Sequence, residues 1–210
     1  MRDWAAGILC FVLMAAGAWA YLFASAQKTV RISRSLRLLF KGGTTMMAAL
    51  LAFYGSLQSQ LPAHFIIVLG IAVCAAADVI LELHFKAGML VFATGHICYI
   101  AAFVMMGGIS HLSILVYALL IVMIAVATQK LKKSLDEPYI PYLLYSLIIA
   151  AMFSLALAQP LTAALGALLF VISDSLLFLG IMKVKSKVSH TAVISTYYLA
   201  QFLLALSTIV

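Results

Sequence analysis

Residues 64–83 read HFIIVLGIAVCAAADVILEL. Only two residues of this stretch, Asp78 and Glu82, are acidic, and none is Lys or Arg. An α-helix needs about 20 predominantly apolar residues to cross the hydrocarbon core of a bilayer. The stretch therefore predicts a transmembrane helix that carries carboxyl groups near one of its ends.

The rest of the chain repeats this apolar pattern. Of the 210 residues, 66% are hydrophobic and 9% are charged, whereas soluble domains are about half apolar and a quarter charged. Polar loops and turn residues separate eight apolar segments, near residues 4–24, 38–57, 64–83, 89–106, 112–129, 139–158, 162–182 and 191–209. The sequence predicts an all-α integral membrane protein with eight transmembrane helices in a single domain, residues 1–210.

The basic residues distinguish the two sides of the membrane. Eleven of the 13 Lys and Arg lie in or beside the first, third, fifth and seventh connections, and the other connections carry none. They are Lys28, Arg31, Arg34, Arg37, Lys86, Lys130, Lys132, Lys133, Lys183, Lys185 and Lys187. Because cytoplasmic loops carry the excess of Lys and Arg, both termini are expected outside. The net charge of +7 thus reflects orientation, and no nucleic-acid partner is expected.

The third and seventh segments share a pattern. Gly70 and Asp78 recur as Gly166 and Asp174 at a constant offset of 96 residues. An offset of four spans preserves the direction of a helix, so the two halves are expected to be parallel repeats about an axis along the membrane normal. The repeats would cover residues 1–106 and 112–210.

Polar residues inside the apolar segments are the candidates for function. An ionisable side chain inside a span costs on the order of 3 kcal/mol unless it is paired or faces a polar cavity. The candidates are Lys41, Asp78, Glu82, His96 and Asp174, with the polar set Tyr99, Ser173, Ser175, Tyr197, Tyr198 and Gln201. With the predicted orientation they lie on five helices in the cytoplasmic half, which predicts one polar cavity open toward the cytoplasm.

Several of these residues also fit a structural interpretation. Lys41 would snorkel to the interface from the start of its helix, and Glu82 would be a solvated interfacial residue. His96 would be a core histidine bonded to a carbonyl, and the two tyrosines near residue 197 would pack helices. The aspartates are different, because two carboxyl groups at matched depth are costly for packing alone.

Motifs of the common hydrolases are absent. The sequence contains no GxSxG elbow, no P-loop and no HExxH pair. The histidines are spread over loops and different helices, at His64, His84, His96, His111 and His190. No metal and no other cofactor is therefore expected, and carboxylate acid/base chemistry remains.

Five segments in order along nearly the whole chain carry the polar candidates. They are FKGGTT (40–45), ADVIL (77–81), GHICYI (95–100), FVISDSL (170–176) and TYYLAQ (196–201). Together they resemble the YhhN family. The resemblance implies a lysoplasmalogenase of the bacterial inner membrane, which hydrolyses the vinyl ether bond of lysoplasmalogens to a fatty aldehyde and glycerophosphoethanolamine or glycerophosphocholine. Lysophospholipid substrate and membrane lipids are then its partners.

The expected site follows from the resemblance and the positions together. Asp78 and Asp174 are expected to be catalytic, as an acid and an anion for an oxocarbenium-like intermediate. The residues expected to bind or orient the substrate are Lys41, His96, Tyr99, Tyr197, Tyr198 and Gln201.

Two other classes of protein fit the same carboxylates. A proton-coupled transporter or lipid scramblase uses repeats and midplane carboxylates, and an assembly protein would pair them with basic residues of a partner. A transporter is expected to break helices near its site, but all four prolines lie at segment ends. The pattern therefore favours an enzyme.

Overall fold

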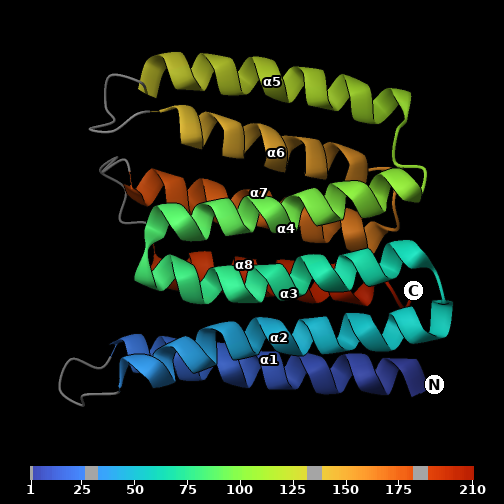
Figure 1. The fold of residues 1–210 in the computed structure, drawn as a ribbon, viewed down its shortest axis with the longest axis vertical. Coiled ribbons are helices and arrows are strands. Elements are labelled where there is room, and N and C mark those ends of the chain that lie inside the picture. Colours follow the sequence, from blue (N-terminus) through green and yellow to red (C-terminus); the bar gives the residue numbers. More distant parts are fainter. Residues whose placement is uncertain (1, 27–32, 132–138, 182–188) are drawn as a thin grey trace.

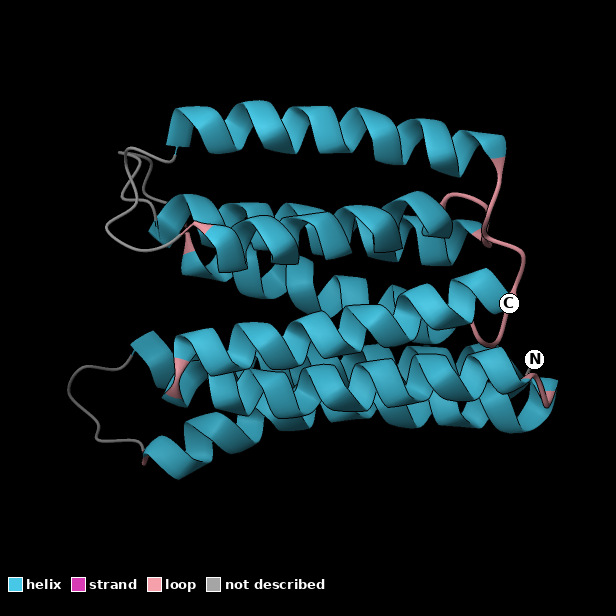
Figure 2. Cartoon of the chain, turned by 45° about the horizontal axis from the view of Figure 1, so that its top comes forward, coloured by secondary structure: helices cyan, strands magenta, loops and turns pink. Residues whose placement is uncertain are grey.

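A computed structural model of the chain describes residues 2–26, 33–131, 139–181 and 189–210, and the regular structure of these residues is entirely helical (Figures 1 and 2). The helices are α1 (Arg2–Ala26), α2 (Arg34–Ser59), α3 (Pro62–Leu83), α4 (Phe85–Met105), α5 (His111–Leu131), α6 (Ile140–Ala156), α7 (Leu161–Ile181) and α8 (His190–Leu206). The prediction of an all-α protein is confirmed, and each predicted segment corresponds to one helix. Of the basic residues that predicted the orientation, seven lie outside the described residues: Lys28, Arg31, Lys132, Lys133, Lys183, Lys185 and Lys187.

Six of the described helices, α1 to α5 and α7, are long and apolar enough to cross a membrane. Their outer faces carry large apolar side chains, and on α5 Leu115, Val122 and Met123 are each more than half exposed. Helices α6 and α8 have 17 residues each, about 26 Å at 1.5 Å per residue, against about 30 Å of hydrocarbon. The chain is an integral membrane protein, and eight complete crossings remain a prediction.

Helices α2 and α4 each begin four residues earlier than predicted. The side chain of Ser33 caps α2 by accepting the backbone N–H of Leu36 at 3.3 Å, as serine does at a helix N-terminus. Helix α4 begins at Phe85 because only His84 separates it from α3. Both early starts place the polar residues that follow deeper in their helices than predicted.

Successive helices run in opposite directions, and both chain ends lie at the same end of the bundle (Figure 1). Helix α8 is central, because it packs against α1, α2, α3 and α7. Helix α5 lies at one edge (Figure 1), and among the described helices it packs closely only against α6. The orientation of this bundle in the membrane stays a prediction.

The two halves of the bundle differ in how closely their helices approach. In the predicted repeat, α2 corresponds to α6 and α8 corresponds to α4. Helix α2 packs against α8, and α6 likewise packs against α4. Helix α8 also packs against α1 and α3, but within the described residues the backbone of α4 does not come close to α5 or α7. The bundle is therefore more open around α4, α5 and α7 than around the equivalent helices. The parallel repeat itself remains a prediction.

Helices α3 and α4 form a tight hairpin. Gly88, in the first turn of α4, lies so close to the backbone of Leu81 on α3 that a Cβ atom would overlap with it. A backbone cannot move aside as the end of a side chain can, so this glycine sets the distance between the two helices.

We expect Gly88→Ala to lower the free energy of unfolding by about 1–2 kcal/mol, because overpacking outweighs the helix propensity gained. Gly43→Ala is the matched control, since nothing lies within 4 Å of an added Cβ on that residue of α2. It should leave stability unchanged or raise it. Unfolding of both variants in detergent checks this, and equal stabilities would contradict the close approach.

Candidate functional site

A cavity of about 390 Å³ lies inside the bundle and is lined by residues of every described helix except α1. Much of its wall is apolar, with Met89 and Phe92 from α4 and Met123 and Ile124 from α5. The polar and titratable residues of the lining are Lys41, Asp78, Tyr142, Tyr145, Ser146, Ser173, Asp174, Ser175, His190 and Tyr197. A space with few polar groups in an apolar wall suits an amphipathic ligand.

The structure divides the predicted site residues into two groups. Lys41, Asp78, Asp174 and Tyr197 line the cavity. His96, Tyr99, Tyr198 and Gln201 are buried but do not line it. One cavity therefore joins both aspartates, while the other four residues contact the lining from behind or support it through hydrogen bonds.

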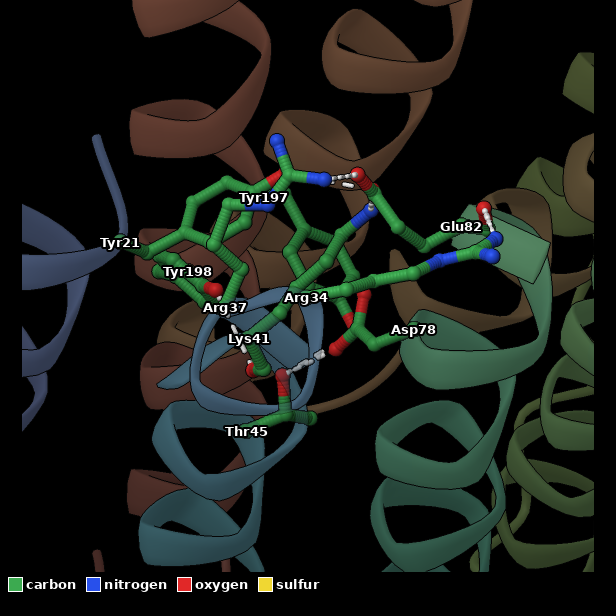
Figure 3. Close-up of polar contacts among 9 residues, drawn as sticks. All are labelled: Tyr21, Arg34, Arg37, Lys41, Thr45, Asp78, Glu82, Tyr197 and Tyr198. Carbon is green, nitrogen blue, oxygen red and sulfur yellow. Dashed lines mark hydrogen bonds and ion pairs between the residues drawn. The ribbon is translucent and has the colours of Figure 1, made fainter. Parts of the chain in front are cut away.

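Asp78 lies in α3 and is only 2% exposed. Its Oδ2 accepts a hydrogen bond from Thr45 Oγ1 at 2.5 Å and another from the Tyr197 hydroxyl at 2.8 Å (Figure 3). Two hydroxyl donors on one oxygen suit a carboxylate, because an ionised carboxyl group only accepts hydrogen bonds. Burial costs this group less when its hydrogen bonds are made.

A line of buried hydrogen bonds continues from Asp78 into the core. The Tyr99 hydroxyl donates to Gln201 Oε1 at 2.8 Å, and Gln201 Nε2 donates to the Tyr197 hydroxyl at 3.3 Å. Tyr197 in turn donates to Asp78. Every donor in this line points toward Asp78, so Tyr99 and Gln201 orient the Tyr197 hydroxyl that bonds to the carboxylate. Tyr99 and Gln201 do not line the cavity themselves.

Lys41 does not snorkel to the interface. Because α2 begins at Arg34, Lys41 lies seven residues into the helix and is only 6% exposed. Its Nζ donates to Glu82 Oε2 at 3.1 Å, and the Tyr198 hydroxyl donates to its backbone carbonyl at 3.2 Å. Tyr198 thereby fastens α8 to α2 beside the cavity.

Glu82 lies near the end of α3 and keeps partial exposure, but it is also paired inside the site. Its side chain is 25% exposed and is the partner of Lys41 (Figure 3). Its Oε2 also accepts a hydrogen bond from the Tyr21 hydroxyl at 3.3 Å. The sequence hint was the spacing of four residues from Asp78, which places both carboxyl groups on one face of α3.

Asp174 lies in α7, and its side chain is 16% exposed. Its Oδ2 accepts a hydrogen bond from the Tyr145 hydroxyl at 2.6 Å and lies 4.0 Å from His96 Nε2. Tyr145, on α6, was missed because no motif or charged neighbour marks it in the sequence. It brings a further helix into the site.

His96 is fully buried and packs edge-on against Phe170, with the ring centroids 4.5 Å apart. Neither ring nitrogen has a hydrogen-bond partner among the described residues. The early start of α4 makes His96 the twelfth of 21 residues, so it lies at mid-helix and not in the first half as predicted. The backbone carbonyl expected in the structural interpretation is not its partner.

In the part of the chain that the structure describes, no three His, Cys, Asp or Glu side chains gather in a way that could hold a metal ion. The chemistry available at the cavity is that of two carboxyl groups, one amine, the imidazole of His190 and several hydroxyls.

Comparison with known proteins identifies the family. A sequence model of the YhhN family matches residues 36–208. The chain belongs to the YhhN family. This match begins just before Lys41 and includes α3 to α8, so it takes in every residue of the predicted site, and the resemblance inferred from the five segments is confirmed.

One relative of this YhhN protein carries a functional name. The human (Homo sapiens) protein lysoplasmalogenase TMEM86B is 36% identical over 147 residues, which is 67% of this chain and 62% of the human protein. The aligned part of the chain thus spans less than two thirds of the length of that relative. No solved structure matches this YhhN protein.

Proposed function

We propose that this protein is a membrane-embedded lysoplasmalogenase that hydrolyses the vinyl ether bond of lysoplasmalogens. The observation that carries the proposal is the single cavity lined by Asp78 and Asp174, in a YhhN family member that is similar to a human lysoplasmalogenase. The apolar wall accommodates the alkenyl chain, and the carboxyl groups supply the acid and the anion that vinyl ether hydrolysis needs.

The reaction proceeds in three steps. A carboxylic acid donates its proton to the carbon of the double bond that does not bear the ether oxygen. This leaves an oxocarbenium ion on the carbon that bears the ether oxygen. Water adds to that carbon and returns a proton to the carboxylate, which gives a hemiacetal. The hemiacetal hydroxyl then loses its proton, the bond between that carbon and the glycerol oxygen breaks, the glycerol oxygen takes up one proton, and a fatty aldehyde is released.

We propose different roles for the two carboxyl groups from their surroundings. Asp78 accepts two hydroxyl hydrogen bonds on one oxygen and lies beside the lysine that lines the same cavity, so it is the anion that stabilises the oxocarbenium ion. Asp174 has a single hydroxyl donor among the described residues and is the more exposed of the two to the cavity. Asp174 is therefore the acid, in the manner of paired carboxylates in glycoside hydrolysis.

The remaining residues of the site position these groups. Tyr197 and Gln201 hold Asp78 through the aligned hydrogen bonds, and Tyr99 extends that line. His96 lies behind Asp174 with an unpaired Nε2 at 4.0 Å.

The decisive experiment uses the purified protein in detergent. Incubation with a lysoplasmalogen is expected to release fatty aldehyde and the glycerophospho headgroup in equal amounts, while the 1-O-alkyl analogue, which has no double bond, stays intact. Lipid movement across reconstituted liposomes without aldehyde release would instead support the transporter or scramblase, which uses the same intramembrane carboxylates.

We expect Tyr145→Phe to lower kcat about tenfold with little change in KM. The substitution removes the 2.6 Å hydrogen bond to Asp174, which strengthens as Asp174 gives up its proton and becomes a carboxylate. A hydrogen bond to a charged group contributes about 1.5–3 kcal/mol, and a loss of about 1.4 kcal/mol lowers the rate tenfold. Tyr117→Phe, on α5, is the matched control and should retain the parent rate. A normal kcat for Tyr145→Phe would show that the bond is only structural.

A further inference from the structure

A polar stripe runs along one face of α2 from its first turn to the buried carboxylate. Arg34, Arg37, Lys41 and Thr45 are spaced by three, four and four residues, so their side chains lie on the same face of the helix. Thr45 reaches Asp78 at the inner end, and Figure 3 shows both arginines beside Glu82 at the other. The stripe connects the end of the bundle to the catalytic cavity.

The two guanidinium groups are incompletely paired within the described residues. Arg34 Nη2 donates to the backbone carbonyl of Glu82 at 3.3 Å, and Arg37 Nη2 lies 3.9 Å from Glu82 Oε1. Arg37 Nε is buried and has no hydrogen-bond partner there. Lys41 is closer to the same carboxylate, at 3.1 Å, so Lys41 and Arg37 share the charge of Glu82, while Arg34 bonds to a backbone carbonyl.

We infer that Arg34 and Arg37 bind the phosphate of the lysophospholipid headgroup beside the polar part of the cavity. The inference deepens the proposed function and rests on it for the substrate class. A guanidinium offers several N–H donors in a planar fork that matches phosphate oxygens. Since Glu82 and Asp78 offset two of the three positive charges of Arg34, Arg37 and Lys41, a phosphodiester anion compensates the third.

The dimensions of the stripe agree with this ligand. Arg37 and Thr45 are eight residues apart, about 12 Å along the helix axis, and Thr45 marks the level of Asp78. In a lysoplasmalogen, six bonds separate the phosphorus atom from the vinyl carbon that becomes the oxocarbenium centre beside Asp78, about 7 Å at roughly 1.2 Å per bond. A phosphate oxygen and its hydrogen bond add about 4 Å, so the lipid spans the interval with its headgroup on the arginines.

Binding of a lipid that cannot be cleaved tests this site apart from catalysis. The probe is a radiolabelled 1-O-alkyl-lysophospholipid with a phosphocholine headgroup, bound to the purified protein in detergent. Arg34→Gln and Arg37→Gln are each expected to weaken its binding about tenfold, and Arg37→Lys less, because the charge stays while the fork is lost. Lys86→Gln, an exposed lysine at the same end of the bundle, is the matched control and should bind as the parent does.

Two competitors identify what the arginines recognise. A 1-O-alkylglycerol, which has no phosphate, should displace the probe equally well from the parent and from both Arg→Gln variants. Inorganic phosphate at millimolar concentration should not displace it, and displacement would overturn the assignment to a lipid headgroup.

The site is wrong if both Arg→Gln variants are folded and bind the probe within twofold of the parent. If one variant does not fold, the other and Arg37→Lys still decide the question. A parent protein that binds the probe through these arginines but releases no aldehyde from lysoplasmalogen would retain the phosphate site and reject the proposed hydrolysis.

Discussion

Asp174→Asn and Asp78→Asn are each expected to lower the rate of aldehyde release at least a hundredfold. A positioned acid or base contributes about 10²–10⁴ to a rate, and asparagine keeps the shape of the side chain without its proton or charge. Asp174→Asn cannot protonate the vinyl carbon. Asp78→Asn cannot stabilise the positive charge that follows. The measurement is steady-state aldehyde release by the purified variants with a lysoplasmalogen.

A loss of rate counts only when the protein remains folded and still binds its ligand. Each variant should unfold in detergent within a few degrees of the parent and should bind the 1-O-alkyl-lysophospholipid within a few fold. If both variants meet these conditions and retain activity within a few fold of the parent, the two-carboxylate mechanism is wrong.

Lys41→Met is expected to lower the free energy of unfolding by about 3 kcal/mol. Removing one partner of a buried ion pair costs about 3–5 kcal/mol, and we take the lower end because the side chain of Glu82 is 25% exposed. Methionine fills the volume of the lysine stem but leaves Glu82 and Asp78 without a nearby ammonium group. Equilibrium unfolding in mixed micelles gives the free energy.

The double variant Lys41→Met with Glu82→Gln separates the ion pair from the other roles of the lysine. Removing both charges should restore most of the lost stability, because replacing both partners of a pair costs far less than leaving one partner buried and unpaired. Additive losses in the double variant would show that Lys41 and Glu82 do not depend on each other. Activity should stay low even when stability returns, since the cation beside Asp78 is still missing.

The fold could be predicted from the sequence because lipid imposes a simple rule. Each segment of about 20 apolar residues must satisfy its backbone hydrogen bonds internally, so it forms a helix. The starts of α2 and α4 were misplaced because polar and basic residues at a membrane interface do not end a helix. Ser33 and the single-residue connection at His84 set those boundaries, and hydropathy does not detect either feature.

The sequence predicted the site only as a set of ionisable residues whose burial in the membrane costs free energy. Asp78, Asp174 and Lys41 stand out because a charge in an apolar segment needs a partner, and all three line the cavity. The partners themselves, Glu82 and Tyr145, lie on other helices, and a single sequence does not show which helices meet. Their pairing depends on the packing of the bundle, so it could not be read from spacing.

The way α5 is attached has a consequence for how a lipid reaches the cavity. This helix supplies Leu120, Met123, Ile124 and Ala127 to the cavity wall, yet among the described helices it packs closely only against α6. Local opening requires the least free energy where the fewest buried contacts must break. For the proposed lipid substrate we therefore expect entry from the bilayer by displacement of α5 alone, while the hydrogen-bonded core around α8 stays intact. In this arrangement, substrate exchange and catalytic geometry depend on different helices, and a mutation in α5 would change the rate of lipid entry without disturbing the carboxyl groups.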